Sequence, residues 1–243
     1  LLASVGNYMK DFGDNAFIIS DEFFLEKVNK EALSSIKENG LSGFVEKFNY
    51  ECTEAEVDRL GKIVVENKAN VIIGIGGGKT LDVSKAVAYY HHLPVILFPT
   101  IASTDAPCTA LSVLYKENGE FDKYLFLPQN PDMVIADTAI IASAPQRFFS
   151  AGVGDALATY FEARACYQAD GLNLVNQRPS RTGLGLAQLC FEILSENIDK
   201  AMDAVRHKIT TQALEQTIEA TIYLSGVGAE AGGLAAAHAV NNG

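Results

Sequence analysis

The sequence contains few of the features that mark secreted or membrane-bound proteins. Its four cysteines, Cys52, Cys108, Cys166 and Cys190, form no C-x-x-C pair, and a chain of 243 residues is large enough to bury a core without disulfides. No apolar run approaches the length that spans a bilayer. The chain does not open with a basic segment followed by an apolar one, so no signal peptide is evident. We therefore expect free thiols and a cytoplasmic location.

Basic residues are also scarce. Lysine and arginine total 19 against 30 aspartates and glutamates, which gives a net charge of −11. Nucleic acids and anionic membrane surfaces require basic patches, so neither is an expected partner. With 48% hydrophobic residues, no internal repeat and no low-complexity segment, the chain is expected to be an ordinary globular protein.

The hydrophobic pattern predicts alternating strands and helices in the first part of the chain. Strands are expected at 15–20, 43–49, 71–75, 94–99 and 132–137, with helices at 22–38, 53–68 and 79–90. Asn118-Gly119 between two apolar stretches predicts a hairpin, because both residues tolerate positive φ. From Pro145 onward the pattern is helical. The sequence thus predicts a Rossmann-like parallel sheet in an α/β domain over 1–144 and an all-helical domain over 145–243.

The segment VIIGIGGGKT, residues 71–80, predicts an anion site. A buried strand ends in Gly76, Gly77 and Gly78, and a helix follows. Glycines let the backbone turn sharply and leave the amide groups at the helix N-terminus open to an anion, and a phosphate is the anion expected.

The two common phosphate motifs do not fit this segment. A Walker A loop would need glycine at Ile73, and the dinucleotide fingerprint would need glycine at Lys79. A tight turn without a ligand is the alternative. Lys79 and Thr80 at the start of the helix favour a ligand.

Four segments together resemble the iron- or zinc-dependent alcohol dehydrogenase superfamily, and within it the glycerol dehydrogenases. They are GIGGGKTLDVSKA (74–86), PTIASTDAPCTALSVLY (99–115), GVGDALATYFEARA (152–165) and YLSGVGAEAGGLAAAHAV (223–240). The resemblance covers nearly the whole chain. It implies a further strand before Leu1 and more of the helical domain after Gly243.

The resemblance implies NAD as the cofactor. Taken alone, Asp21 after the first strand reads as a helix cap, but the family places its ribose-binding aspartate here, and a carboxylate would repel the 2′-phosphate of NADP. The other cofactor-binding residues that the resemblance implies are Gly76, Gly77, Gly78, Lys79, Thr80, Asp82, Thr100, Ser103, Thr109, Leu111 and Tyr115.

The resemblance also implies a substrate and metal site. Asp105 would meet the substrate hydroxyls and act in catalysis, and Asp155 and His238 would bind both metal and substrate. Without the resemblance, Asp155 reads as a helix cap and His238 as a core histidine. Oxygen and imidazole donors suit Zn²⁺ or Fe²⁺. The third ligand would be a histidine beyond Gly243.

Other candidates are weaker. Glu162 lies two helical turns after Asp155 and is a rival ligand. His91, His92 and His207 are expected to have no role in the site.

The function implied is reversible, metal-assisted oxidation of glycerol to dihydroxyacetone with NAD, in a homo-oligomer that is an octamer in this family. Two alternatives stay open. One is a relative that acts on another diol or on a phosphorylated polyol, and the other is an NAD-binding chain without turnover.

Overall fold

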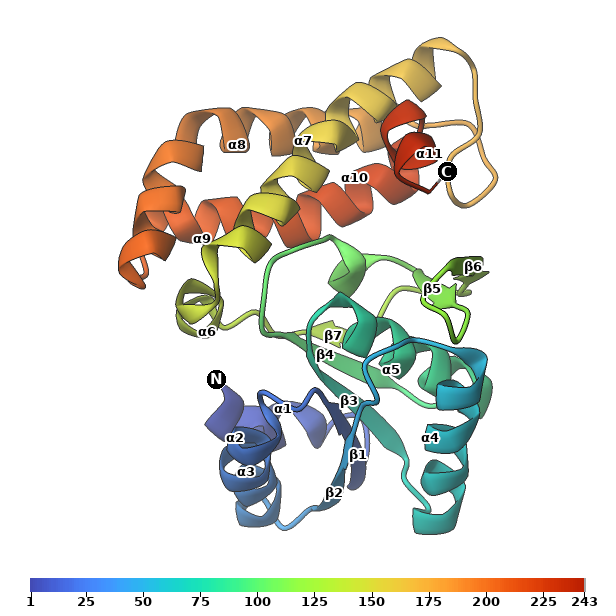
Figure 1. Ribbon diagram of the computed structural model, residues 1–243, viewed down its shortest axis with the longest axis vertical. Coiled ribbons are helices and arrows are strands. Elements are labelled where there is room, and N and C mark those ends of the chain that lie inside the picture. Colours follow the sequence, from blue (N-terminus) through green and yellow to red (C-terminus); the bar gives the residue numbers. More distant parts are fainter. Residues whose placement is uncertain (243) are drawn as a thin grey trace. The chain divides into compact units, whose positions relative to one another are not determined.

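The chain folds into two compact units (Figure 1). The computed structural model describes residues 1–242, with the backbone alone at Ala239, Asn241 and Asn242. Leu1–Thr100 and Ala110–Asp137 form an α/β unit, and Ile101–Thr109 belongs with the chain from Thr138 onward to a helical unit. By this division the α/β unit ends at Asp137, ahead of the boundary predicted near Ala144.

The α/β unit is built on a parallel five-stranded sheet in the order β2-β1-β3-β4-β7. The strands are β1 (Asn15–Ser20), β2 (Ser42–Lys47), β3 (Val71–Gly76), β4 (Val95–Pro99) and β7 (Met133–Val134). The predicted strand order along the chain and the Rossmann-like architecture are confirmed. The chain leaves β1 toward one edge of the sheet and β3 toward the other, so the carboxyl ends of β1 and β3 form a topological switch point, where such sheets bind ligands.

The last strand is shorter than the predicted 132–137. Asp132 and Ile135 still donate backbone hydrogen bonds to β4, at 3.1 Å to Val95 O and 2.8 Å to Leu97 O. The chain then enters helix α6, which begins at Thr138, so the pairing with β4 ends near Ile135.

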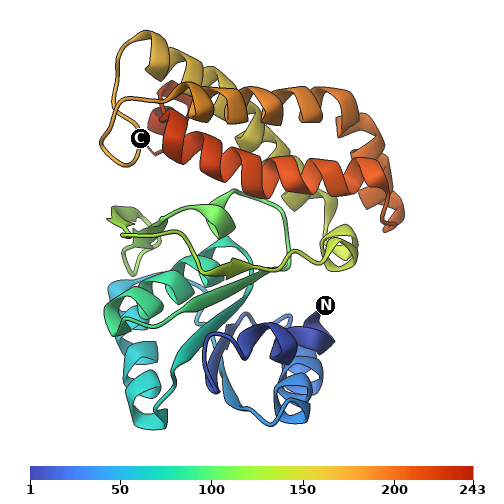
Figure 2. The same cartoon turned by 180° about the vertical axis from the view of Figure 1, so that it is seen from behind.

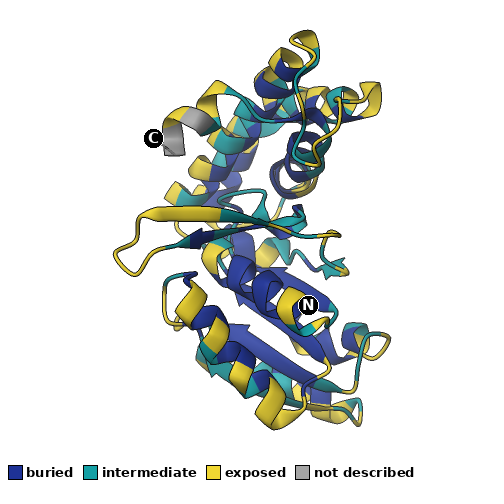
Figure 3. Ribbon diagram, turned by 90° about the vertical axis from the view of Figure 1, so that its right-hand side faces the viewer, coloured by how far each residue is buried: buried dark blue, intermediate teal, exposed yellow. Residues whose placement is uncertain are grey.

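Helices cover both faces of this sheet (Figures 1 and 3). The N-terminal turns are η1 (Leu2–Ser4) and α1 (Val5–Met9), and the longer helices are α4 (Glu54–Asn67) and α5 (Gly78–His91). The predicted helix 22–38 is a continuous run of α2 (Leu25–Lys27), the π-turn η2 (Val28–Ala32) and α3 (Leu33–Glu38). It begins later than predicted because residues 21–24 form a turn. Right-handed crossovers place α4 and α5 on the face opposite α3, and α4 and α5 bury Phe17, Ile19 and Ile72 beneath them.

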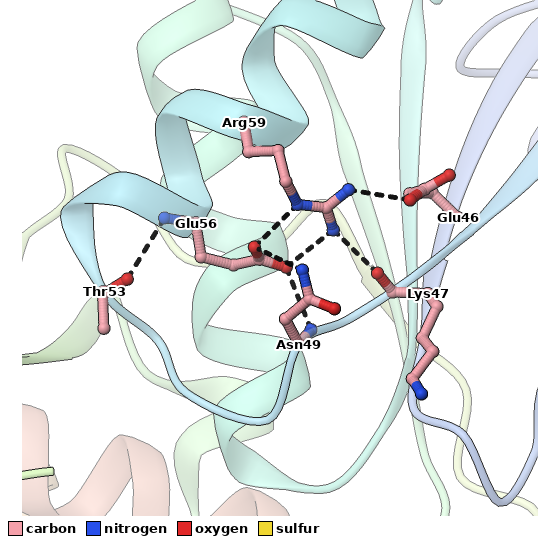
Figure 4. Close-up of polar contacts among 6 residues, drawn as sticks. All are labelled: Glu46, Lys47, Asn49, Thr53, Glu56 and Arg59. Atoms are coloured by element: carbon pink, nitrogen blue, oxygen red, sulfur yellow. Dashed lines mark hydrogen bonds and ion pairs between the residues drawn. The ribbon is translucent and has the colours of Figure 1, made fainter. Parts of the chain in front are cut away.

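A polar network fixes α4 to the end of the edge strand β2 (Figure 4). The Arg59 guanidinium donates to both oxygens of Glu56 at 2.8 Å, to Glu46 Oε1 at 2.7 Å and to the carbonyl of Lys47 at 2.8 Å. Glu56 in turn accepts from the backbone and side chain of Asn49, at 3.0 and 3.1 Å. One buried carboxylate and one arginine thus satisfy the backbone where the strand ends.

The predicted hairpin is present as an antiparallel pair, β5 (Leu111–Tyr115) and β6 (Phe121–Phe126). Gly119 in its turn has φ +83°, which explains the glycine after Asn118.

The helical unit begins with the short turn η3 (Ala106–Cys108). Its main helices are α6 (Thr138–Ser143), α7 (Gln146–Gln168), α8 (Arg181–His207), α9 (Gln212–Glu219), α10 (Ser225–Gly232) and α11 (Ala236–Asn242). The π-turn η4 (Ala220–Leu224) joins α9 to α10, and the three form one rod (Figure 2). Small residues let the helices approach closely: a Cβ on Gly183 would lie 2.8 Å from the backbone of Ala231, and one on Gly232 would lie 2.6 Å from Ala163 Cβ.

Among the described residues, none of the helices combines the length and the apolar composition needed to cross a membrane. All four cysteines are free thiols.

Candidate cofactor and metal sites

The glycine turn lies at the switch point of the α/β unit. β3 ends at Gly76 and α5 begins at Gly78, and the N-cap residue Gly77 offers no side chain to the free amides of the helix. Thr100, at the end of β4, donates its amide to the carbonyl of Gly76 at 3.0 Å. The open helix N-terminus has the geometry that binds a phosphate.

Gly76 must be glycine because Asp21 and Thr80 crowd it. A Cβ there would lie 2.7 Å from Asp21 Oδ2 and 2.7 Å from Thr80 Oγ1. The Asp21 carboxylate accepts the Phe24 amide at 3.1 Å, so it caps the turn after β1 as well as lying against the glycine turn. Burial raises the pKa of Asp21, against the backbone amides of Phe24, Phe23 and Gly77 that hydrogen-bond to it. Asp21 therefore caps the turn after β1 from the same position that is expected to contact the ribose.

Lys79 and Asp82 have partners within the protein. Lys79 Nζ donates to Glu51 Oε2 at 2.7 Å and lies 4.7 Å from the centre of the Tyr115 ring. Asp82 is buried and pairs with the fully buried Lys85 at 2.9 Å. This geometry gives no support to a direct cofactor contact by Asp82.

The buried pair anchors the hairpin instead. Asp82 Oδ2 accepts the amide of Val113 at 3.2 Å, its carbonyl accepts Ser112 Oγ at 2.9 Å, and Lys85 Nζ donates to the carbonyl of Leu111. Burial raises the pKa of Asp82 and the charge of Lys85 opposes the rise. The strand that bears Leu111 and Tyr115, two predicted cofactor residues, is thus fixed to α5.

Two other predicted cofactor residues, Ser103 and Thr109, belong to the segment of the helical unit between β4 and β5. Thr109 is buried and its hydroxyl donates to the carbonyl of Ala106 at 3.4 Å, while Ser103 is half-buried. Thr100 is buried at the end of β4.

The helical unit brings the three predicted substrate and metal residues together. His238 Nε2, on α11, lies 3.5 Å from Asp155 Oδ1, on α7, and both side chains are about one-quarter exposed. The backbone of Asp105 hydrogen-bonds to the Asp155 carboxylate. Burial raises the pKa of Asp155 above its ordinary value, and the nearby His238 and this hydrogen bond only partly offset the rise. Ser225 Oγ donates to Asp105 Oδ2 at 2.9 Å and lies 2.9 Å from Thr159 Oγ1. Sequence reasoning missed Ser225 and Thr159, because single hydroxyls inside helices carry no local signal.

The spacing of Asp155 and His238 fits a metal ion. Two ligand atoms bound to one tetrahedral zinc ion are separated by about 3.4 Å. The observed 3.5 Å between Nε2 and Oδ1 matches this separation, and imidazole nitrogen with carboxylate oxygen suits zinc or ferrous iron. Within residues 1–242, no group of three or more metal-ligating side chains surrounds one point.

The remaining histidines lie elsewhere. His207 Nδ1 contacts the carbonyl of Asp203 in its own helix, and the ring of His91 packs over Gly61.

Comparisons with known proteins identify relatives of this chain. A family model described as iron-containing alcohol dehydrogenase matches residues 1–138. The chain is 50% identical to a glycerol dehydrogenase of Pseudomonas putida over 242 residues, covering all of this chain and 66% of that protein. It is 44% identical to a glycolaldehyde reductase of Halobacterium salinarum, covering 98% of this chain and 66% of that protein.

A solved structure matches as well. The crystal structure of a probable glycerol dehydrogenase from Sinorhizobium meliloti aligns with a TM-score of 0.94 at 36% identity, over 99% of this chain and 66% of that one. The chain therefore spans just under two thirds of the length of these relatives. Because the family model covers more than half of the chain and the fold agrees throughout, the chain belongs to the iron-containing alcohol dehydrogenase family.

Proposed function

We propose that the protein oxidises glycerol to dihydroxyacetone with NAD, reversibly. The observation that carries the proposal is the meeting of Asp105, Asp155 and His238 in the helical unit. The side chains of Asp155 and His238 have the spacing of metal ligands, and the backbone of Asp105 hydrogen-bonds to the Asp155 carboxylate. The similarity to a glycerol dehydrogenase at 50% identity supports the substrate.

The residues have distinct tasks in this reaction. Asp155 and His238 would hold a divalent zinc or iron ion, which when bound lowers the pKa of an alcohol and so favours loss of its proton. Asp105, held by Ser225, accepts hydrogen bonds from the polyol hydroxyls and so orients the secondary carbinol. NAD, when bound, supplies the hydride acceptor.

The chemistry of this cluster favours a neutral polyol. The side chains that contact one another here are carboxylates, hydroxyls and one imidazole. A phosphorylated substrate would require a lysine or arginine to compensate its charge. The glycolaldehyde reductase relative supports a second candidate, the reduction of small hydroxyaldehydes by the same hydride transfer run in reverse.

Substitution of Asp105 tests the proposed function. Asp105→Ala is expected to lower kcat/KM for glycerol by about 100-fold, because the lost hydrogen bonds orient the substrate. NAD affinity, measured by calorimetric titration, should stay within a factor of about two. Asp199→Ala, which removes an exposed carboxylate from α8, is the matched control and should behave as the unsubstituted protein. Absence of glycerol oxidation in the unsubstituted protein, with NAD bound normally, would support a binding protein without turnover.

The cofactor choice is tested at Asp21. The unsubstituted protein is expected to bind NAD more tightly than NADP, and Asp21→Asn should narrow the difference by about tenfold. Asparagine keeps an oxygen for the Phe24 amide but removes the charge that would repel a 2′-phosphate. Asp58→Asn on α4 removes the same charge from an exposed site and should leave the ratio unchanged. Equal dissociation constants for NAD and NADP in the unsubstituted protein would contradict the assignment.

A further inference from the structure

A buried glutamate holds His238 from the side opposite Asp155. Glu162, on α7, is only 4% exposed. Its Oε2 lies 2.6 Å from His238 Nδ1, and its Oε1 accepts the amides of Ala235 at 2.9 Å and of His238 at 3.2 Å. One carboxylate therefore binds both the backbone and the ring of the histidine at the start of α11.

This arrangement argues against Glu162 as a metal ligand. Both of its oxygens already accept hydrogen bonds, and the two nitrogens of an imidazole point away from each other. An ion between His238 Nε2 and Asp155 would lie on the far side of the ring from Glu162. Burial raises the pKa of Glu162, but the hydrogen bonds from His238 and Ala235 outweigh it and leave that pKa below its ordinary value.

The hydrogen bond between Glu162 Oε2 and Nδ1 decides the tautomer of the ring. Two carboxylates face the ring, and a carboxylate only accepts hydrogen bonds. Glu162 Oε2 is the closer, at 2.6 Å from Nδ1 against 3.5 Å between Asp155 Oδ1 and Nε2, so the single proton of a neutral His238 sits on Nδ1. The lone pair of Nε2 then faces Asp155, as a metal ligand requires.

We propose that Glu162 is a positioning residue that fixes His238 in the Nδ1–H tautomer and aims Nε2 at the site shared with Asp155. The proposal rests on the proposed function for the identity of that site. The hydrogen bonds to the two backbone amides give Glu162 a second task, which is to set the start of α11.

Glu162→Gln separates these two tasks. The glutamine oxygen can still accept the amides of Ala235 and His238, whereas its NH₂ group would then donate toward Nδ1. Nδ1 must then accept this hydrogen bond, so the proton of the neutral ring lies on Nε2, and a protonated Nε2 cannot bind a metal ion. The opposite orientation of the amide would set its NH₂ group against two backbone N–H donors.

The test uses metal-free protein at a pH at which the ring of His238 is neutral. Long-range ¹H–¹⁵N correlation spectra should show the Nδ1–H tautomer in the unsubstituted protein and the Nε2–H tautomer in Glu162→Gln. Zinc affinity, measured by competition with a chromophoric chelator, should fall by about 10- to 100-fold in the variant. Glu192→Gln, an equal charge change at an exposed position of α8, should alter neither.

An Nε2–H tautomer in the unsubstituted protein would overturn the inference, even if Glu162→Gln fails to fold. So would a variant with unchanged tautomer and unchanged zinc affinity. A different result bears on the proposed function instead: zinc affinity that does not respond to His238→Ala would remove the metal from this site, while the tautomer would still report on Glu162.

Discussion

His238→Ala is expected to lower glycerol oxidation on the order of 10³-fold, the largest loss among the substitutions considered. The ring supplies Nε2, 3.5 Å from Asp155 Oδ1, and alanine leaves the carboxylate as a single ligand from this pair. Loss of one ligand weakens the metal site and its geometry together, and with it the pKa shift of the bound alcohol. Steady-state kinetics, with elemental analysis of the same preparation, measures both effects.

The control for this experiment is His207→Ala. His207 is exposed at the end of α8 and contacts the backbone of its own helix. Its removal should change neither metal content nor rate. NAD affinity should survive in both variants, because the glycine turn and Asp21 belong to the α/β unit. Full metal content and normal activity in His238→Ala would show that the ligands lie elsewhere.

Alanine substitutions at two glycines of α7, two residues apart in the sequence, are expected to change the free energy of unfolding in opposite directions. A Cβ on Gly152 would lie 2.1 Å from the carbonyl oxygen of Ala102 and 2.8 Å from Thr221 Cγ2. Gly152→Ala must therefore push away the segment Ile101–Thr109, which carries Asp105. We expect a loss of roughly 2–4 kcal/mol in the free energy of unfolding, since the clash is with backbone, and a fall in glycerol turnover.

Gly154→Ala is the matched control. No atom lies within 4 Å of a Cβ at this position, so the substitution should stabilise the protein by up to about 1 kcal/mol through the higher helix propensity of alanine. Urea unfolding followed by circular dichroism compares the two variants under the same conditions. A similar change in both would refute the close approach of α7 to Ala102.

In the segment Ile101–Thr109, the local sequence determines one property and a tertiary contact determines another. Its polar residues after β4 are typical of a ligand-binding loop, and the sequence predicts that much. The segment belongs to the helical unit. It packs closely against α7 because Gly152, about fifty residues further along the chain, has no side chain. No pattern within the segment encodes that partner.

The sequence by itself determined the order of strands and helices, the hairpin at Asn118-Gly119 and the glycine turn before α5. These features depend on periodicity and on backbone conformations that neighbouring residues dictate. Only the tertiary structure decided which side chains became partners: Glu162 with His238, 76 residues apart, and Asp105 with Ser225, 120 apart. Such pairs arise from the packing of α7, α10 and α11, where the identity of a residue's neighbour depends on helices distant in the chain. The local sequence around Glu162 indicates at most a rival metal ligand, and the fold places the carboxylate against the histidine ring.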